Sequence, residues 1–284
     1  MKMVSIFCPE FTGDKEERVK ISLIGAGNMG YPLLKGAVAA FGAENVTFQT
    51  KRREHEEALS AELGVPYAPR LLEMVMQSNI IVLAVKPQYA PEVYPDVKLA
   101  MSKEKIIVSV MAGVTVEELK RRTGAAKIVR AMPNTPAMLG EGVTCISYSG
   151  EVTEVEKEVV RKLFLSLGKI EEITENLMNA AICANGSSPA FVYMFMEALA
   201  DGVVKYGIPR EMAYRLVAQT VLGSAKMLLE TGEHPGKLKD AVCSPGGTTI
   251  AGVAALEEHG FRNAVLKAAD ACYEKAESMN AKKM

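Results

Sequence analysis

Two patterns of hydrophobic positions divide the chain near residue 174. Before that point, short runs of apolar residues alternate with amphipathic stretches. The clearest run, Ile80-Ile81-Val82-Leu83-Ala84-Val85, is apolar at consecutive positions, as in parallel strands covered on both faces. The pattern predicts strands at 19–24, 45–50, 79–85, 105–110, 127–132, 143–147 and 169–174, and helices at 29–40, 53–63, 70–77, 91–101, 115–122 and 153–167. This alternation predicts an α/β domain with a Rossmann-type, doubly wound sheet.

From residue 175 onwards the strand pattern stops, and Ala, Leu, Met, Glu and Lys dominate. Helices are predicted at 175–184, 189–206, 209–229, 235–242, 249–259 and 261–279. We therefore expect a Rossmann domain at 19–174, followed by an all-helical C-terminal domain at 175–284. Small apolar residues in the helical half suit either an internal core or contact with a second copy of the chain: Ala213, Val217, Val221 and Ala225.

The composition is that of an ordinary globular protein, with 284 residues, 49% hydrophobic, 24% charged and a net charge of −1. This charge indicates neither a nucleic-acid partner nor an anionic membrane surface. The apolar runs are far shorter than the ~20 residues that span a membrane. Five scattered cysteines lack disulfide or zinc spacing, which favours reduced thiols in a cytoplasmic protein without a metal site. Residues 1–18 lack a signal-peptide pattern, and we expect a poorly ordered extension there.

A glycine-rich turn, Gly25-Ala26-Gly27-Asn28-Met29-Gly30, stands between the first predicted strand and the first predicted helix. In this context the GxGxxG spacing indicates dinucleotide binding. Gly25 allows the tight turn, Gly27 lets the backbone approach a pyrophosphate, and Gly30 permits close packing of the helix on the strand. The helix N-terminus then faces the phosphate charge.

The end of the second strand indicates which dinucleotide is preferred. NAD-preferring sites usually place an acidic residue there, which binds the ribose 2′-hydroxyl. This chain has Thr50-Lys51-Arg52-Arg53 instead, and three cations beside a hydroxyl suit a 2′-phosphate. We therefore predict NADPH as the cofactor, with NADH as the alternative.

Further cofactor contacts are expected where later strands end, because ligands of open α/β sheets lie beyond the carboxyl ends of the strands. The segments concerned are Ala84-Val85-Lys86-Pro87 and Val110-Met111-Ala112. The complete set of predicted cofactor-binding residues is Ile24, Gly25, Ala26, Gly27, Asn28, Met29, Gly30, Thr50, Lys51, Arg52, Arg53, Ala84, Val85, Lys86, Pro87, Val110, Met111 and Ala112.

One segment of the helical half differs from its surroundings: Cys243-Ser244-Pro245-Gly246-Gly247-Thr248-Thr249. Glycines before a helix N-terminus leave backbone N–H groups free for an anion the size of a carboxylate, with two hydroxyls beside them. The alternative from the residues alone is a well-capped loop between two helices.

At this point the chain resembles the pyrroline-5-carboxylate reductases, the last enzymes of proline biosynthesis. The resemblance rests on the glycine turn, Ala84-Val85-Lys86-Pro87, Met132-Pro133-Asn134-Thr135-Pro136, Leu238-Lys239-Asp240, Ser244-Pro245-Gly246-Gly247-Thr248-Thr249 and His259-Gly260-Phe261-Arg262. It implies that the Ser244–Thr249 segment holds the carboxylate and ring nitrogen of the substrate. Ser188 and Ala241 depart from the glycine and the asparagine found in other members. The resemblance also implies a homodimer built through the helical domain and assembled further.

The expected reaction is NAD(P)H-dependent reduction of 1-pyrroline-5-carboxylate to L-proline. A cyclic imine can arrive already protonated as an iminium, so the protein mainly positions the reactants. The predicted substrate-binding residues are Ser244, Gly246, Gly247, Thr248 and Thr249. Thr248 and Thr249 are also the predicted catalytic residues, because either hydroxyl could meet the ring nitrogen. The three histidines, His55, His234 and His259, show no triad or metal spacing, and we interpret His55 and His234 as surface residues.

Two other classes of function fit parts of the sequence. A 3-hydroxyacid or ketopantoate type dehydrogenase would use a lysine of the helical domain as acid or base, and the available ones are Lys205, Lys226, Lys237 and Lys239. None of them has the expected polar neighbours. A non-enzymatic NADP(H)-binding regulator would keep the glycine turn but would need no second site.

Overall fold

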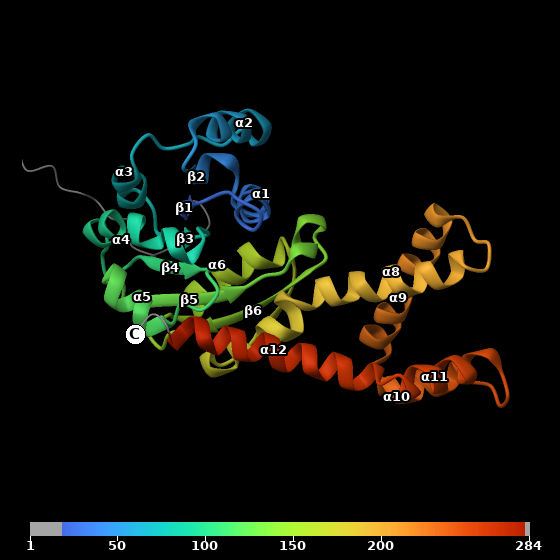
Figure 1. Ribbon diagram of the computed structural model, residues 1–284. Coiled ribbons are helices and arrows are strands. Elements are labelled where there is room, and N and C mark those ends of the chain that lie inside the picture. Colours follow the sequence, from blue (N-terminus) through green and yellow to red (C-terminus); the bar gives the residue numbers. More distant parts are fainter. Residues whose placement is uncertain (1–18, 282–284) are drawn as a thin grey trace, which may run out of the picture. The chain divides into compact units, whose positions relative to one another are not determined.

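The computed structural model describes residues 19–281, so the extension expected at 1–18 lies outside the described residues. Its centre is a seven-stranded sheet in the order β2-β1-β3-β4-β5-β6-β7 (Figure 1). The strands are β1 (Ile21–Ile24), β2 (Val46–Gln49), β3 (Ile80–Leu83), β4 (Ile106–Ser109), β5 (Lys127–Met132), β6 (Gly142–Tyr148) and β7 (Gly168–Glu172). Only the β5–β6 pairing is antiparallel within this sheet. All seven strands were predicted, with ends shifted by a few residues at most.

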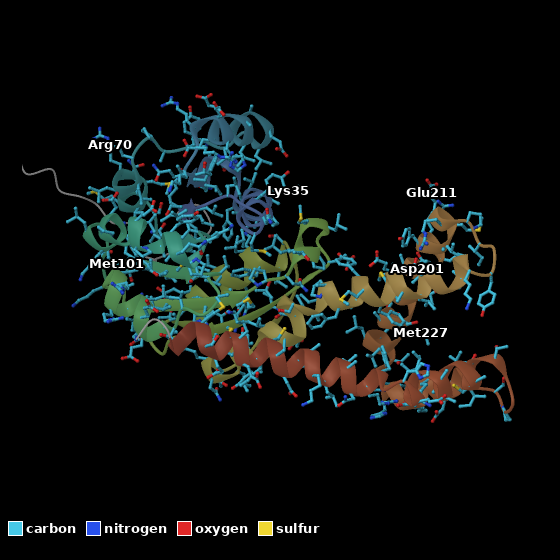
Figure 2. The ribbon with its side chains drawn as sticks, in the orientation of Figure 1. Lys35, Arg70, Met101, Asp201, Glu211 and Met227 are labelled. Carbon is cyan, nitrogen blue, oxygen red and sulfur yellow. The ribbon has the colours of Figure 1, made fainter. Side chains whose placement is uncertain are left out.

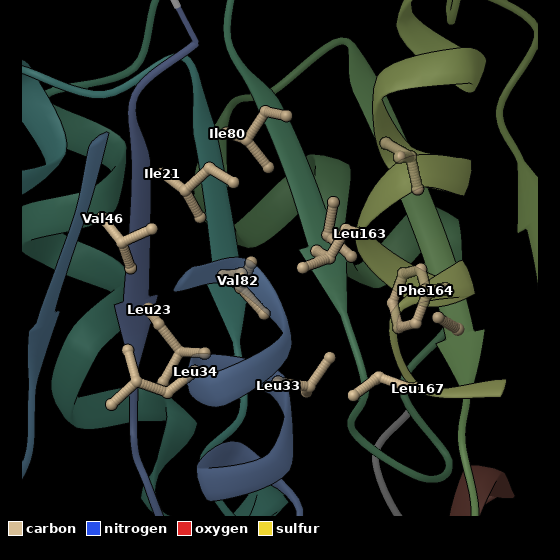
Figure 3. Packing of buried hydrophobic residues seen from close by; sticks show 14 of the residues in the cluster. Ile21, Leu23, Leu33, Leu34, Val46, Ile80, Val82, Leu163, Phe164 and Leu167 are labelled. Carbon is tan, nitrogen blue, oxygen red and sulfur yellow. The ribbon is translucent and has the colours of Figure 1, made fainter. Parts of the chain in front are cut away.

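Helices cover both faces of the sheet, as the consecutive apolar positions predict. They are α1 (Gly30–Phe41), α2 (Arg53–Leu63), α3 (Leu71–Met76), α4 (Ala90–Leu99), α5 (Val116–Thr123) and α6 (Glu154–Leu165). On one face, Leu33 and Leu34 of α1 and Phe164 of α6 pack on strand residues such as Val82 (Figure 3). The other face packs against α3, α4 and α5 through residues that include Ile81. Alternate residues of one strand thus pack into two separate cores, one on each face, which confirms the doubly wound sheet.

Two helix starts in this region are fixed by local capping. Thr115 accepts a hydrogen bond from the Glu118 N–H at 3.1 Å, just before α5. Thr153 and Glu156 form a reciprocal capping box at the start of α6. Glu156 is buried and also pairs with Lys127 of β5 at 2.6 Å, which ties α6 to the sheet.

The segment after β7 differs from the single helix predicted at 175–184. It forms a 3₁₀ turn (Glu175–Leu177), a short α7 (Met178–Ala181) and a π-helical turn (Ile182–Gly186). Asn185 in the π turn donates hydrogen bonds to the carbonyl oxygens of Met132 (2.6 Å) and Val143 (3.2 Å). These long-range bonds hold the widened turn, and the predicted continuous helix is wrong for this physical reason.

The chain divides into two compact units by its internal contacts. The first extends through Gly186, beyond the boundary expected at 174, and also takes in the end of α12 from Tyr273 onwards. There Asn179 donates a hydrogen bond to Glu277 at 2.5 Å. The second unit is Ser187–Cys272.

The second unit is entirely helical in its regular structure, with α8 (Ser188–Val204), α9 (Arg210–Thr231), α10 (Pro235–Val242), α11 (Thr248–Glu258) and most of α12 (Phe261–Ala281). Its small core lies between α8 and α9 and includes Ala213 and Val217, with Val221 packed against them. Ala213 and Val217 are therefore buried and Val221 is partly buried, whereas Ala225 is exposed.

Many large apolar side chains of the helical unit are exposed in the single chain. Met194 is 68% exposed, Leu222 59% and Met227 54%, the last visible on α9 in Figure 2. Exposed apolar surface on this scale marks an interaction face. Among the described residues, none of the helices combines the length and apolar character that crossing a membrane requires.

Candidate functional site

A cavity of about 840 Å³ lies in the sheet unit, at the carboxyl ends of β1, β2 and β3. β2 and β3 flank β1 on opposite sides, so the order in which strands are added to the sheet reverses at β1. Such switch points are where open α/β sheets bind their ligands. The lining residues are Ile24, Gly25, Ala26, Gly27, Gln49, Thr50, Lys51, Arg52, His55, Pro69, Arg70, Leu71, Leu72, Ala84, Val85, Lys86, Tyr89, Glu92, Val93 and Asp96.

The glycine turn closes one side of this cavity in a conformation that needs its glycines. Gly25 has φ of +93°, and its N–H donates to the Gln49 carbonyl at 2.8 Å. A Cβ on Gly30 would lie 2.0 Å from the Gly25 oxygen, so α1 can pack this closely only without a side chain there. A Cβ on Gly27 would meet nothing within 4 Å. Gly27 thus presents bare backbone to open space, which fits a dinucleotide whose pyrophosphate must approach the chain.

The turn after β2 is held by a buried carboxylate. Glu56 is 7% exposed and accepts the Thr50 N–H at 2.7 Å. The Thr50 hydroxyl donates to the Arg52 carbonyl at 3.1 Å. Thr50, Lys51 and Arg52 therefore lie in an ordered turn beside the cavity, as an anion site at this strand end requires.

The predicted cofactor residues fall into two groups. Ten line the cavity: Ile24, Gly25, Ala26, Gly27, Thr50, Lys51, Arg52, Ala84, Val85 and Lys86. Eight do not: Asn28, Met29, Gly30, Arg53, Pro87, Val110, Met111 and Ala112.

Two of the eight have other roles visible in the structure. Arg53 pairs with Glu57 at 3.1 Å, and its guanidinium lies 5.8 Å from the Tyr67 ring centre. Gly30 acts through helix packing, as described above.

Sequence reasoning missed ten residues of the lining. Gln49 ends β2, and His55 lies in the first turn of α2, where the sequence interpretation placed a surface histidine. The others come from the segment that leads into α3 and from the region of α4: Pro69, Arg70, Leu71, Leu72, Tyr89, Glu92, Val93 and Asp96. The rule that ligands lie beyond strand ends points to Gln49 and His55, but no local pattern singles out the rest.

The end of β5 and the residues that follow it, Met132-Pro133-Asn134, are fixed by side-chain amides. The Asn134 Oδ1 accepts the Val143 N–H at 3.0 Å. The Asn185 side-chain amide donates hydrogen bonds to the carbonyl oxygens of Met132 and Val143. The segment that follows β5 is thereby tied to both β6 and the π turn.

In the helical unit, Ser244–Gly247 forms a tight turn directly before α11, which begins with Thr248 and Thr249. The Gly247 N–H donates to the Ser244 carbonyl at 3.0 Å, and Gly246 has φ of +67°. A Cβ on Gly247 would lie 2.4 Å from the Ser244 Oγ, so any side chain there would make the Ser244 hydroxyl shift. The first-turn amides of α11, at Thr248 and Thr249, have no acceptor within the helix and can bind an anion.

Three of the four lysines available to an alternative acid–base mechanism already pair with acidic residues. Lys226 and Lys237 pair with Glu230 (3.6 Å) and Glu233 (2.6 Å). The hydrogen bond to Asp240 raises the pKa of Lys239. A lysine with a raised pKa holds its proton more firmly, so this contact does not prepare Lys239 to act as a base. In the described part of the chain, no group of three or more His, Cys, Asp or Glu could hold a metal ion.

Comparison with known proteins assigns both halves of the chain. Residues 175–279 match the family model described as pyrroline-5-carboxylate reductase dimerisation, and residues 20–113 match that of the F420-dependent NADP oxidoreductases. The chain is 43% identical over 264 residues to pyrroline-5-carboxylate reductase of Escherichia coli (strain K12), covering 92% of this chain and 98% of that protein.

Solved structures give the same result. The pyrroline carboxylate reductase of Plasmodium falciparum, a crystal structure with NADP bound, superposes with a TM-score of 0.83 at 34% identity, covering 93% of this chain and 99% of the other. The pyrroline-5-carboxylate reductase of Coxiella burnetii superposes with a TM-score of 0.86 at 29% identity, covering 92% and 98%. With the glycine turn, the Ser244–Thr249 turn and these similarities together, the chain belongs to the pyrroline-5-carboxylate reductase family.

Proposed function

We propose that this protein reduces 1-pyrroline-5-carboxylate to L-proline with NADPH, the last step of proline biosynthesis. The observation that carries this proposal is the turn before α11, in a chain that is 43% identical to a reductase of that name. A nucleotide cavity alone is common to many oxidoreductases. The turn adds an anion site flanked by hydroxyls, which suits a small carboxylated imine.

The residues of the cavity would hold NADPH, which supplies a hydride when bound. Backbone at Gly25 and Gly27 would lie against the pyrophosphate. Thr50, Lys51 and Arg52 would bind the 2′-phosphate, which supports NADPH over NADH. Val110, Met111 and Ala112 stay proposed contacts for the nicotinamide end, because they follow β4 at the same edge of the sheet.

The turn before α11 would bind the substrate. We assign the carboxylate to the backbone N–H groups of Thr248 and Thr249, with Ser244 and Gly246 shaping the turn. The Gly247 N–H, also expected at the carboxylate, already donates to the Ser244 carbonyl and helps to hold the turn instead. The hydroxyl of Thr248 or Thr249 would contact the ring nitrogen and orient the iminium carbon. Since the iminium is already protonated, no separate acid is needed, and catalysis comes mainly from positioning.

Assembly is part of the proposal. The helical region matches the family's dimerisation model, and its exposed apolar side chains support a homo-oligomer. We propose a dimer built through residues 175–279, with further association of dimers. We also propose a cytoplasmic location, which suits the reduced thiols expected from the sequence.

The test is a comparison of substrates with one purified protein. Steady-state rates are measured for 1-pyrroline-5-carboxylate and for 2-keto acids, each with NADPH and with NADH, and proline is quantified by chromatography. We expect proline formation with NADPH and negligible turnover of keto acids. Preferred reduction of a keto acid would favour a ketopantoate type enzyme. Tight NADPH binding without turnover of any imine would favour a regulator.

A further inference from the structure

Two side chains of the segment after β7 hold the loops at the carboxyl ends of β4 and β5. These strands run parallel, so their carboxyl ends meet at one edge of the sheet, and β6 begins at that edge because it pairs antiparallel with β5. The loop after β4 contains Val110, Met111 and Ala112, the proposed contacts of the nicotinamide end. The residues that fix these loops come from 175–186, and all of them lie in the first compact unit.

Glu175, at the start of this segment, fixes the far end of the loop after β4. Its Oε1 accepts the Val116 N–H at 2.7 Å, at the first residue of α5. The same oxygen accepts a hydrogen bond from the Arg130 guanidinium at 2.9 Å. The Arg130 side chain is only 5% exposed, so the ion pair is shielded from solvent on the side of β5. Hydrogen bonds between charged groups are the strong ones, and this one ties the loop to the sheet.

Asn185, near the end of the segment, fixes the next loop along the edge. Its amide donates to the carbonyl oxygens of Met132 at 2.6 Å and Val143 at 3.2 Å, at the end of β5 and near the start of β6. The residue is buried, so water competes little for these bonds. It lies in a π turn, a geometry that is rare and occurs frequently at functional sites.

The segment and the two loops also share one small hydrophobic cluster. Met132 is buried together with Met178 and Ala181 of α7, and Ala112 packs against them. Ala112 belongs to the loop after β4, whereas Met132 ends β5. Packed side chains transmit displacements, because the interior has little free volume. A shift of the segment therefore moves Ala112, and with it the surface offered to the nicotinamide.

We infer that Glu175 and Asn185 are positioning residues, which hold the loops around the nicotinamide end of the cofactor where hydride transfer needs them. This inference rests on the proposed function and names residues that set the geometry of the same site. Glu175 acts through the loop that carries Ala112, and Asn185 acts through the end of β5. Rates of such reactions depend steeply on placement, and a displacement of about 1 Å can cost roughly a hundredfold.

The two ends of the cofactor should respond differently to these residues. The adenosine half would occupy the cavity beyond β1, β2 and β3, and neither Glu175 nor Asn185 lines that cavity. Its affinity should therefore be independent of both side chains. A change at either residue should act on the nicotinamide half alone, which a general loss of folding would not do.

Asn79 provides a matched control at the opposite edge of the same sheet. It is buried like Asn185, and its Oδ1 accepts the Lys20 N–H at 2.8 Å. These two residues directly precede β3 and β1, so this contact lies at the amino ends of the strands. Asn79→Ala thus removes a buried amide that joins two distant segments of backbone, but at a site away from the cofactor.

The first measurement needs no turnover. Dissociation constants of NADPH and of adenosine 2′,5′-bisphosphate, which lacks the nicotinamide half, are determined by calorimetry for the full chain, Asn185→Ala, Glu175→Gln and Asn79→Ala. Asn185→Ala should bind the bisphosphate like the wild type and lose about three- to tenfold in NADPH affinity. Glu175→Gln keeps an oxygen for the Val116 N–H but loses the charge, so its selective loss should be smaller. Asn79→Ala should bind both ligands like the wild type.

The second measurement is the reaction itself. With 1-pyrroline-5-carboxylate, kcat of Asn185→Ala should fall about ten- to a hundredfold. The primary isotope effect with NADPH deuterated at C4 of the nicotinamide should increase, because hydride transfer becomes the slow step. Asn79→Ala should keep kcat and the isotope effect of the wild type even where urea unfolding shows a comparable loss of stability.

Equal losses of NADPH and bisphosphate affinity in Asn185→Ala would overturn the inference, and so would an unchanged kcat in both Asn185→Ala and Glu175→Gln. If Asn185→Ala does not fold, Glu175→Gln decides by the same two measurements. A wild type that forms no proline would refute the proposed function. In that case a selective loss of NADPH affinity in the two variants would still support the inference, and its absence would overturn the inference as well.

Discussion

Replacing Gly27 and Gly30 by alanine, one at a time, separates the two roles that the glycine turn combines. A Cβ on Gly30 would lie 2.0 Å from the Gly25 oxygen, whereas ordinary contacts of a Cβ begin near 3.4 Å. The start of α1 must therefore move by more than an ångström, and such overpacking costs about 1–3 kcal/mol. A Cβ added to Gly27 has nothing within 4 Å, so Gly27→Ala should change the free energy of unfolding by less than about 0.5 kcal/mol.

For nucleotide binding the order is reversed. Gly27→Ala should weaken NADP⁺ binding far more than it lowers stability. The methyl group of Gly27→Ala occupies the space through which the pyrophosphate approaches the backbone. Loss of one hydrogen bond to a charged group is worth about 1.5–3 kcal/mol, or roughly ten- to a hundredfold in Kd. Urea unfolding measures stability, and calorimetric titration with NADP⁺ measures affinity. The reasoning is refuted if Gly27→Ala destabilises the protein as much as Gly30→Ala, or if it binds NADP⁺ as tightly as the wild type.

Three further predictions concern other parts of the molecule. Thr249→Ala should lower kcat with 1-pyrroline-5-carboxylate by about a hundredfold at unchanged NADPH affinity, as expected for one lost donor. Thr249→Ser should recover most of the lost rate. An unaltered rate in Thr249→Ala would remove this hydroxyl from the mechanism. Leu222→Glu puts a charge on an exposed apolar position of α9, so light scattering should show monomers, and a persistent dimer would place the contact elsewhere. The hydrogen bond from Lys120 lowers the pKa of Glu151 from 4.5 to about 2. The stabilisation that the Glu151–Lys120 contact gives the folded protein is therefore present above pH 4.5 and lost as the pH falls through 2. In an NMR titration of Lys120→Met, the midpoint of Glu151 should return towards 4.5. A Glu151 midpoint that stays near 2 would contradict the assignment.

The sheet could be predicted from the sequence because its strands are buried on both faces. Ile80, Ile81, Val82 and Leu83 are all fully buried, with alternate residues in separate cores. Consecutive apolar positions are a local signal, so one sequence is enough to detect them. The helix starts at Thr115 and Thr153 are local for the same reason, since each cap bonds to a residue three positions on.

The π turn could not be predicted, because its cause is not local. Asn185 binds carbonyls that lie 53 and 42 residues earlier in the chain, at Met132 and Val143. The return of α12 to the first unit depends likewise on Asn179 and Glu277, 98 residues apart. Only the folded chain brings these partners together.

The basic residues after β2 show a third limit. Lys51, Arg52 and Arg53 look equivalent in the sequence, yet only the first two line the cavity. α2 begins at Arg53, so the helix turns this side chain towards Glu57 and Tyr67. His55, two residues further along α2, lines the cavity instead. The sequence indicates the charge at this strand end, but the first residue of the helix decides which side chains face the ligand.

The most direct test of the central claim follows one hydrogen from cofactor to product. NADPH deuterated at C4 of the nicotinamide is incubated with the protein and 1-pyrroline-5-carboxylate, and the proline formed is examined by mass spectrometry. If the protein is the proposed reductase, one stereospecifically labelled NADPH gives proline with a single deuterium at C5, in equal amount to the NADPH consumed. Oxidation of both stereospecifically labelled forms of NADPH without labelled proline would contradict it.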